Sequence, residues 1–336
     1  MKILIAAGGT GGHLFPAERL ASELGGENDV FFAGYGLKKG FFGKNYRFYE
    51  ILSGPLSKFW KIGFGFIQSL WVLIKERPDV VVSFGSYHVF PVVLAAKCLH
   101  KRIVLFEANT SLGKVNRFFR KSADAIGMQY PVPGARHVLP FPWKIREEQE
   151  EIFRGEKRFT ILVFGGSQGA QFLNEIFLEG VPIIDAEFDF RVIHLCGKNG
   201  SEKEIKVKYE KMGIHAHVKP FAKNMHALYS ISDLAIARAG ASTIAELLHY
   251  EVPALLIPYP FASEDHQKKN ANYFADVGAG FFMEQKMVTA NSLVSQVIAL
   301  KKNLKEHRQA ILDYKKKQKD LKKMAFSDLV LEVASR

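Results

Sequence analysis

Short apolar runs alternate with longer segments of helical periodicity through the first part of the chain. Apolar runs of this length, each separated from the next by a helix, predict buried parallel strands. We expect these strands at residues 3–7, 30–33, 48–52, 80–84, 103–106 and 125–128. The first strand leads through a glycine-rich loop into a predicted helix over residues 16–24, with Pro16 in the first turn, where proline is favoured.

The alternation stops and then begins again. A proline-rich stretch at residues 130–143 and a charged segment at residues 147–156 interrupt it, and an apolar run at residues 160–164 restarts it. Each half therefore begins with a strand and a glycine loop, Gly8-Gly9-Thr10-Gly11-Gly12 in the first and Gly165-Gly166-Ser167-Gln168-Gly169 in the second. This repeat predicts the α/β class, with two Rossmann-like doubly wound domains facing a cleft.

The interruption also marks the predicted domain boundary. We expect an N-terminal domain over residues 1–145 and a C-terminal domain over residues 146–323. The apolar segment within residues 324–336 is expected to pack back onto the N-terminal domain. The lysine-rich residues 301–323 predict a solvated surface helix.

Residues 234–267 contain a strand, a turn of small residues, a helix, a second strand and a loop. The helix is predicted to begin at Ser242 and Thr243, and Glu246 follows Thr243 at the spacing of a capping box. A helix start at the carboxyl ends of parallel strands is also where α/β proteins bind nucleotides and phosphates. The spacing alone supports a helix cap and a ligand site equally.

The two glycine loops match neither G-x-G-x-x-G nor the P-loop pattern. Glycines at a helix start let backbone N–H groups converge on an anion, and they also allow tight packing between a strand and a helix. Two such loops at equivalent positions favour phosphate binding. His13 ends the first loop, where its imidazole is a candidate general base near neutral pH, with a packed or capping histidine as the equal alternative.

Composition narrows the possible partners. The formal net charge of +12 indicates an anionic partner, such as a phosphorylated substrate, a nucleic acid or an acidic membrane surface. The two cysteines lie far apart and the start of the chain does not read as a secretory leader, so we expect a reducing, cytoplasmic location. The sequence has no Asp-x-Asp pair and no zinc-ligand spacing, and we expect neither a bound metal nor a cofactor.

Residues 56–75 combine aromatic, aliphatic and basic side chains in one segment. The segment is too short and too interrupted to span a bilayer, but its composition suits the surface of an anionic membrane. Burial in the core is the ordinary alternative for these apolar side chains. The expected membrane contacts are Phe59, Trp60, Phe66, Trp71, Lys58, Lys61 and Lys75.

Six motifs occur in one order along nearly the whole chain, and each is weak alone. They are Gly8 to His13 with Pro16, Pro78 to Val81, Glu107 with Asn109, Gly165 to Ala170, Arg238 to Glu246, and Asp265 to Gln267 with Asn270 and Ala271. Together they resemble the bacterial peptidoglycan N-acetylglucosaminyltransferases. This family transfers GlcNAc from UDP-GlcNAc to undecaprenyl-pyrophosphoryl-MurNAc-pentapeptide in the last cytoplasmic step of peptidoglycan precursor synthesis.

The resemblance implies a glycosyltransferase B fold with the UDP-GlcNAc donor held mainly by the C-terminal domain and Glu246 on the ribose hydroxyls. The implied donor-binding residues are Thr10, Gly11, Gly12, Asn109, Lys144, Ser167, Ala222, Arg238, Ala241, Ser242, Thr243, Ile244, Ala245, Glu246 and Gln267. It places the acceptor diphosphate near Gly8, Gly9 and Tyr87 in the N-terminal domain, and makes His13 the candidate catalytic base. It also implies a peripheral protein on the cytoplasmic face of the inner membrane.

The chain departs from the family pattern at a few positions. Lys144 stands where the family has an arginine, Phe106 replaces a histidine, and Ser86 replaces a glycine before Tyr87. Lys268 stands where a second glutamine is sometimes found. Lysine keeps the positive charge of arginine but lacks its planar fork, so the donor contact of Lys144 is expected to be weaker.

The mechanism implied by the resemblance is a single displacement with inversion. The C4 hydroxyl of MurNAc attacks C1 of GlcNAc, UDP leaves, and a base accepts the proton. Three other functions remain possible from the residues: a UDP-GlcNAc epimerase, a nucleotide-sugar sensor without turnover, and a nucleic-acid binder. An epimerase would not need the segment at residues 56–75, and no compact nucleic-acid motif is present, so we expect no nucleic acid among the partners.

Overall fold

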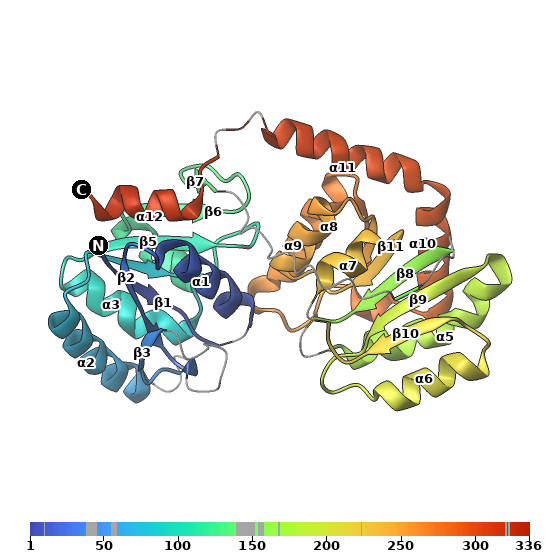
Figure 1. Ribbon diagram of the computed structural model, residues 1–336, viewed down its shortest axis with the longest axis horizontal. Helices are drawn as coiled ribbons and strands as arrows, with labels where there is room; N and C mark the ends of the chain where they lie inside the picture. Colours follow the sequence, from blue (N-terminus) through green and yellow to red (C-terminus); the bar gives the residue numbers. More distant parts are fainter. Residues whose placement is uncertain are drawn as a thin grey trace. The chain divides into compact units, whose positions relative to one another are not determined.

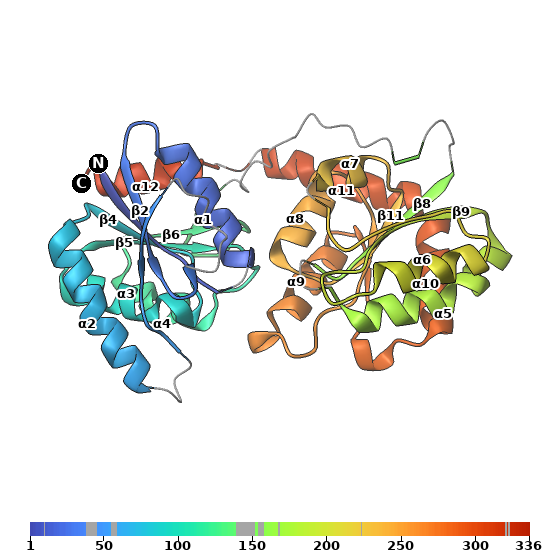
Figure 2. The ribbon, with the colours of Figure 1, turned by 60° about the horizontal axis from the view of Figure 1, so that its bottom comes forward.

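The computed structural model describes residues 1–9, 11–37, 46–54, 59–138, 152–153, 158–166, 169–222, 224–319, 321 and 323–336. Its contacts divide the chain into two compact units (Figures 1 and 2). Unit 1 comprises Met1–Phe141 and Lys322–Arg336, and unit 2 comprises Pro142–Leu321. The predicted boundary between residues 145 and 146 lies outside the described residues.

Unit 1 is built on a parallel sheet with the strand order β3-β2-β1-β4-β5-β6-β7 among the described residues. The six predicted strands are confirmed, and the short β7 is an addition. The order reverses direction between β1 and β4, which makes their carboxyl ends a topological switch point. The strands are β1 (Lys2–Ala6), β2 (Asp29–Gly34), β3 (Arg47–Glu50), β4 (Val80–Ser83), β5 (Arg102–Glu107), β6 (Ala125–Met128) and β7 (Arg136–His137).

Successive residues of these strands point to opposite faces of the sheet, and each face is covered by helices. Ile3 and Ile5 of β1 pack with α1 (Gly11–Leu24) and α12 (Phe326–Ala334). Leu4 and Ala6 pack with α2 (Phe59–Glu76) and α3 (Phe90–Cys98) on the other face. Figure 2 shows these two layers. The near-continuous apolar runs of the strands follow from burial on both faces.

Helix α1 begins earlier than the sequence predicts. It starts at Gly11, so Pro16 lies inside the helix and the prediction that it occupies the first turn is wrong. The glycine loop itself enters the helix, which places Pro16 beyond the first turn. Pro16 has no N–H to donate to the carbonyl of Gly12, so α1 lacks one backbone hydrogen bond there.

The C-terminal helix α12 completes the core of unit 1. Phe326, at its first residue, lies 4.8 Å from the Phe106 ring and 6.0 Å from the Phe84 ring, measured between centroids. Leu329, Val330 and Val333 are buried in the same cluster. A segment almost 200 residues beyond the last strand of unit 1 therefore closes one face of its sheet.

Unit 2 repeats the architecture with the order β10-β9-β8-β11-β12-β13, again parallel within the described residues. Its switch point lies between β8 and β11. The strands are β8 (Phe159–Phe164), β9 (Phe190–Leu195), β10 (Ala216–Lys219), β11 (Leu234–Ala237), β12 (Ala254–Leu256) and β13 (Gly280–Phe282). The predicted α/β class with two doubly wound domains is thus confirmed.

The helices of unit 2 also form two layers (Figure 1). Helices α5 (Gln171–Glu187), α6 (Glu202–Lys211) and α10 (Ala290–Lys302) share one core cluster with the sheet. Helix α8 (Ala241–His249) packs against α9 (His266–Asp276) and α11 (Leu304–Lys319), and α7 (Met225–Ser230) precedes β11. Within the lysine-rich region, the helix expected over residues 301–323 is divided between the end of α10 and α11.

Glu76 ties three elements of unit 1 together. Its carboxylate accepts hydrogen bonds from Tyr49 of β3 and from Arg47 (3.2 Å), and it pairs with Lys2 of β1 at 2.7 Å. The side chain of Glu76 is only 6% exposed. The hydrogen bond from Lys2, followed by that from Tyr49, lowers the pKa of Glu76 to about 2.

We expect Glu76→Gln to lower the free energy of unfolding at pH 7 by roughly 1–3 kcal/mol, as for a hydrogen-bonded charged group. The folded-state pKa of Glu76 lies below its ordinary value of 4.5, so the stabilisation is present above about pH 4.5 and is lost as the pH falls towards 2. Urea unfolding at several pH values should show the difference between wild type and variant shrinking over that range. The exposed Glu27→Gln serves as control, and a difference that stays constant with pH would contradict the assignment.

Candidate functional site

The first glycine loop lies at the switch point of unit 1. Ala6 ends β1 beside Ser83 of β4, so the loop after β1 and the segment after β4 leave the sheet side by side. A Cβ on Gly8 would lie 2.6 Å from the carbonyl oxygen of Tyr35, and one on Gly9 would lie 2.6 Å from Nδ1 of His88. Gly9 also has a φ of +90°. Glycine is therefore required here by close packing and by backbone conformation.

His13 lies in the first turn of α1 and is half-buried. Its Nδ1 is 2.8 Å from the carbonyl oxygen of Phe84, just beyond the end of β4. A carbonyl oxygen can only accept a hydrogen bond, so Nδ1 carries the proton and Nε2 keeps its lone pair. The end of β4 thus holds the ring in the tautomer that a general base requires.

Glu107, the last residue of β5, organises the segment that contains Asn109. One carboxylate oxygen accepts hydrogen bonds from the backbone N–H (3.2 Å) and the side-chain amide (2.8 Å) of Asn109. The other accepts from the backbone N–H of Gly113 (2.9 Å) and from the side chain of Asn116 (3.0 Å). The Asn109 amide is therefore fixed at the carboxyl edge of the sheet, next to the segment after β4.

Tyr87 and His88 follow β4 at the same edge. The Tyr87 side chain is 48% exposed, and its ring lies 4.0 Å from the ring of His88. His88 stacks on Tyr35 at 5.6 Å and bonds through Nδ1 to the Ser86 hydroxyl at 2.8 Å. Burial, and then the charge of His13, lowers the pKa of His88 to about 4, so His88 is neutral near pH 7. The edge of unit 1 thus brings together Gly8, Gly9, His13, Tyr87 and Asn109.

In unit 2, the helix start predicted at Ser242 and Thr243 lies one residue earlier. Gly240 is the N-cap of α8, no side chain caps the helix, and both hydroxyl residues lie inside its first turn. The predicted capping box between Thr243 and Glu246 is therefore wrong. The turn is fixed instead by a tertiary contact, because the side chain of Asn270 donates to the carbonyl of Ala239 at 3.1 Å. The uncapped helix start retains N–H groups that can bind an anion.

Glu246 lies one turn along α8 and is only partly exposed. Its Oε2 accepts a hydrogen bond from the hydroxyl of Tyr229 at 2.5 Å. Burial raises the pKa of the Glu246 carboxyl to about 7, and the hydrogen bond from Tyr229 opposes this rise. No sequence pattern pointed to Tyr229, which lies on α7, 17 residues before its partner.

Arg238 and Gln267 both hold the segment that follows β12. Arg238 is buried, and its guanidinium donates to the carbonyls of Ile257 (3.0 Å) and Pro258 (3.2 Å) and to the side chain of Gln285 (2.7 Å). The side-chain oxygen of Gln267 accepts from the backbone N–H of Tyr259 at 2.9 Å. Gln267 lies in the first turn of α9, not in the predicted loop. Both residues therefore hold the loop that follows β12.

Six of the remaining predicted donor residues lie in described parts of the two units. Ala241, Ile244 and Ala245 belong to α8, Ala222 is buried after β10, and Gly11 and Gly12 begin α1. Thr10, Lys144 and Ser167 lie outside the described residues. Within the part of the chain that the structure describes, no group of three or more His, Cys, Asp or Glu side chains could hold a metal ion.

Helix α2 carries an exposed apolar face, formed by the six side chains that we name the α2 patch. Val72 and Leu73 of the same helix are buried in the core, and Phe66 packs against that core. Phe66, a predicted membrane contact, is partly buried and is not among the exposed side chains of this face. No helix among the described residues is long and apolar enough to cross a membrane. The α2 patch comprises Phe59 (77% exposed), Trp60 (52%), Phe64 (61%), Ile67 (64%), Trp71 (56%) and Ile74 (60%).

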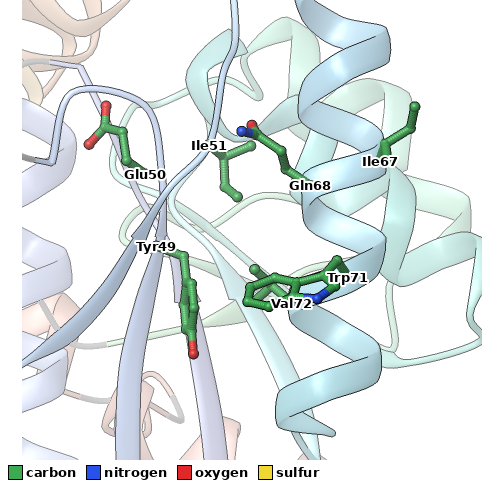
Figure 3. Close-up of a pocket in the computed structure, with 7 residues that line it drawn as sticks. All are labelled: Tyr49, Glu50, Ile51, Ile67, Gln68, Trp71 and Val72. Atoms are coloured by element: carbon green, nitrogen blue, oxygen red, sulfur yellow. The ribbon is translucent and has the colours of Figure 1, made fainter.

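Basic side chains and a shallow cavity accompany the α2 patch. Lys61 lies 5.2 Å from the Trp60 ring and Lys75 lies 4.7 Å from the Trp71 ring. Lys58 lies outside the described residues. A cavity of about 360 Å³ lies between β3 and α2. Figure 3 shows its lining side chains, with the rings of Tyr49 and Trp71 at one end. Its lining is Tyr49, Glu50, Ile51, Ile67, Gln68, Trp71 and Val72.

Both units match family models. Residues 3–128 match the glycosyltransferase family 28 N-terminal domain, and residues 160–329 match the family 28 C-terminal domain. The crystal structure of Acinetobacter baumannii MurG is similar over 98% of this chain and 99% of that chain, with a TM-score of 0.78 and 27% identity. A kitacinnamycin glycosyltransferase structure, 15% identical with a TM-score of 0.69, supports the fold alone.

Relatives named UDP-N-acetylglucosamine–N-acetylmuramyl-(pentapeptide) pyrophosphoryl-undecaprenol N-acetylglucosamine transferase match almost the full chain. The relative from Chlamydia muridarum is 37% identical, with 94% of each chain covered. The relative from Rickettsia canadensis is 32% identical, with 99% of each chain covered. The chain therefore belongs to glycosyltransferase family 28, among the bacterial N-acetylglucosaminyltransferases of peptidoglycan synthesis.

Proposed function

We propose that this chain transfers N-acetylglucosamine from UDP-GlcNAc to the C4 hydroxyl of MurNAc in undecaprenyl-pyrophosphoryl-MurNAc-pentapeptide, with inversion at C1. The observation that carries this proposal is the 37% identity to the Chlamydia muridarum transferase over 94% of both chains. The polar groups at the carboxyl edges of both sheets support it, because such edges are where nucleotides and phosphates bind in α/β proteins.

The donor is proposed to bind mainly to unit 2. The uncapped start of α8 supplies N–H groups and a positive dipole end for the diphosphate. Ser242 and Thr243 lie in that first turn, and Glu246 is suited to accept hydrogen bonds from the ribose hydroxyls. Arg238 and Gln267 support the neighbouring loop, whose Tyr259 and Phe261 are exposed. Ser167, Lys144 and Ala222 keep the donor roles that the family resemblance implies.

The acceptor is proposed to bind at unit 1, near Gly8, Gly9 and Tyr87. The MurNAc C4 oxygen forms the new bond to C1 of GlcNAc as the bond from C1 to the UDP oxygen breaks. His13 Nε2 accepts the proton of the attacking hydroxyl, and UDP leaves with the electron pair of the broken bond. The hydrogen bond from Nδ1 to the Phe84 carbonyl supports this role, because it leaves Nε2 as the basic nitrogen.

The enzyme is proposed to work as a peripheral protein on the cytoplasmic face of the inner membrane. Its acceptor carries a polyprenyl chain, which stays in the bilayer. The α2 patch offers aromatic and aliphatic side chains to the interface, and Lys58, Lys61 and Lys75 offer positive charge to anionic headgroups. Phe66 is not part of this surface, because it packs on the core.

Incubation of the purified chain with radiolabelled UDP-GlcNAc and a lipid-linked MurNAc-peptide tests the activity. We expect the label to move to the lipid and UDP to be released only when the acceptor is present. Release of UDP without acceptor would indicate an epimerase-like reaction, and binding without turnover would indicate a sensor. Salt-sensitive binding to any duplex would indicate a nucleic-acid binder.

Glu246→Ala should lower kcat/KM for UDP-GlcNAc. The loss should correspond to roughly 1.5–3 kcal/mol of transition-state stabilisation, the usual range for a hydrogen bond to a charged group. No capping bond is lost, since Glu246 does not cap α8. Steady-state kinetics with varied donor and a thermal unfolding measurement check this together. Unchanged donor kinetics in a folded variant would exclude Glu246 from the donor site.

His13→Ala should reduce kcat by about 10²–10⁴-fold, the usual share of general-base catalysis, while UDP binding stays close to wild type. His13→Asn is the matched variant, because its side-chain N–H can still donate to the Phe84 carbonyl but has no basic nitrogen. The acidic limb of the kcat profile at saturating donor should disappear in both variants. Activity within a few-fold of wild type in the asparagine variant would mean that another group accepts the proton.

Replacing Lys58, Lys61 and Lys75 by glutamate should release the protein from anionic vesicles. Each lysine near an anionic surface contributes about 1 kcal/mol, so loss of three weakens binding by at least about 100-fold at low salt. Activity on the acceptor in vesicles should fall, and activity on a short-chain soluble acceptor should persist. The control is the same charge change at the exposed Lys316, Lys317 and Lys319 of α11. Equal loss of binding in both variants would point to general charge and not to α2.

A further inference from the structure

Tyr229 is a buried tyrosine whose hydroxyl points at the carboxylate of Glu246. Its side chain is 1% exposed, and the hydroxyl donates to Oε2 of Glu246 at 2.5 Å. Among the residues that the structure describes, Tyr229 is the sole hydrogen-bond donor to that carboxylate. The contact joins α7 to α8, two helices that β11 separates in the chain.

The ring of Tyr229 is held on two sides. It stacks on Tyr250 with centroids 5.2 Å apart and planes 13° apart. It also meets the edge of Phe164 at 6.0 Å and 77°. Phe164 is the last residue of β8, immediately before the second glycine loop. The hydroxyl therefore has a fixed position relative to the switch point of unit 2.

We propose that Tyr229 is a positioning residue for the donor: its hydroxyl occupies Oε2 of Glu246 and turns Oε1 towards the ribose hydroxyls. This inference rests on the proposed role of Glu246 in donor binding. A carboxylate with one oxygen anchored offers the other as an acceptor in a defined direction. Only the ionised form offers all of its lone pairs to two neighbouring hydroxyls.

The contact with Tyr229 also affects the charge state of Glu246. Burial raises the pKa of Glu246 to about 7, and the Tyr229 hydrogen bond lowers it. Burial also raises the pKa of Tyr229 well above 10, so its hydroxyl remains a donor across the working pH range. Loss of that hydroxyl would raise the carboxyl pKa further, and Glu246 would be neutral near pH 7.

The other titratable groups around α8 interact elsewhere. On α11, Lys315 pairs with Glu251 at 2.5 Å and donates to the carbonyl of His249 at 3.0 Å. On α9, Tyr273 donates to Tyr314 of α11 at 3.1 Å. The ring of His226 on α7 lies against Tyr250 at 5.2 Å. Burial, and then the charge of Glu246, raises the pKa of Tyr250, but its hydroxyl makes no hydrogen bond to Glu246 in the described structure.

Tyr229→Phe removes the hydroxyl and keeps the ring, and it is compared with wild type by donor KM between about pH 6 and pH 9. We expect the donor KM to rise roughly tenfold at pH 7 and to recover towards wild type as the pH increases, because Glu246 then ionises. The kcat at saturating donor should change by no more than a few-fold. Tyr250→Phe is the matched control, and its KM profile should follow that of wild type.

Two results would overturn the inference. One is a donor KM in Tyr229→Phe that is unchanged at every pH, and the other is a KM raised by the same factor at every pH, as simple repacking would give. Thermal unfolding confirms that both phenylalanine variants are folded at each pH. Glu246→Gln separates the proposed role of Glu246 from that of Tyr229. A raised, pH-independent donor KM in this variant keeps Glu246 in the donor site. An unchanged donor KM would exclude Glu246 from that site, and the role of Tyr229 would fall with it.

Discussion

The direction of the strands is the constraint on which both sites depend. In a parallel sheet every strand ends at the same edge, so the segments that follow neighbouring strands must lie together. In unit 1 the pairing of Ala6 with Ser83 brings His13 within reach of the Phe84 carbonyl. In unit 2 the pairing of Phe164 with Ala237 brings the second glycine loop beside the turn that leads into α8.

Several side chains near these edges hold the backbone of the segments that follow the strands. Arg238 and Gln267 hold the segment after β12, Asn270 holds the turn before α8, and Glu107 holds the segment around Asn109. The contacts of Arg238 and Asn270 satisfy buried polar groups, which would otherwise carry a cost in free energy. No side chain caps the start of α8, and its first N–H groups can therefore bind an anion.

Helix α2 has two different surfaces. Val72 and Leu73 pack into the core of unit 1, whereas Trp60, Phe64 and Ile67 face outward. Six large apolar side chains on one helix face form a contiguous exposed surface, which soluble monomers seldom carry without a binding role. The acceptor of the proposed reaction remains in a bilayer, and this surface would bring unit 1 to it.

The sequence by itself determined the α/β class, the positions of the unit 1 strands other than β7 and of β8, β11 and β12 in unit 2, the two glycine loops and the family. These features follow from local patterns of apolar residues and glycine, which need no knowledge of distant contacts. Tertiary structure alone decided which face of α2 packs Phe66 against the core, where α8 begins, and what Glu246 contacts. The sequence spacing fits a capping box, but Asn270 and Tyr229 lie on other elements, and only folding brings them to α8. The local pattern around Glu246 permits more than one role for that residue. Contacts with elements far apart in the chain decide which role it has.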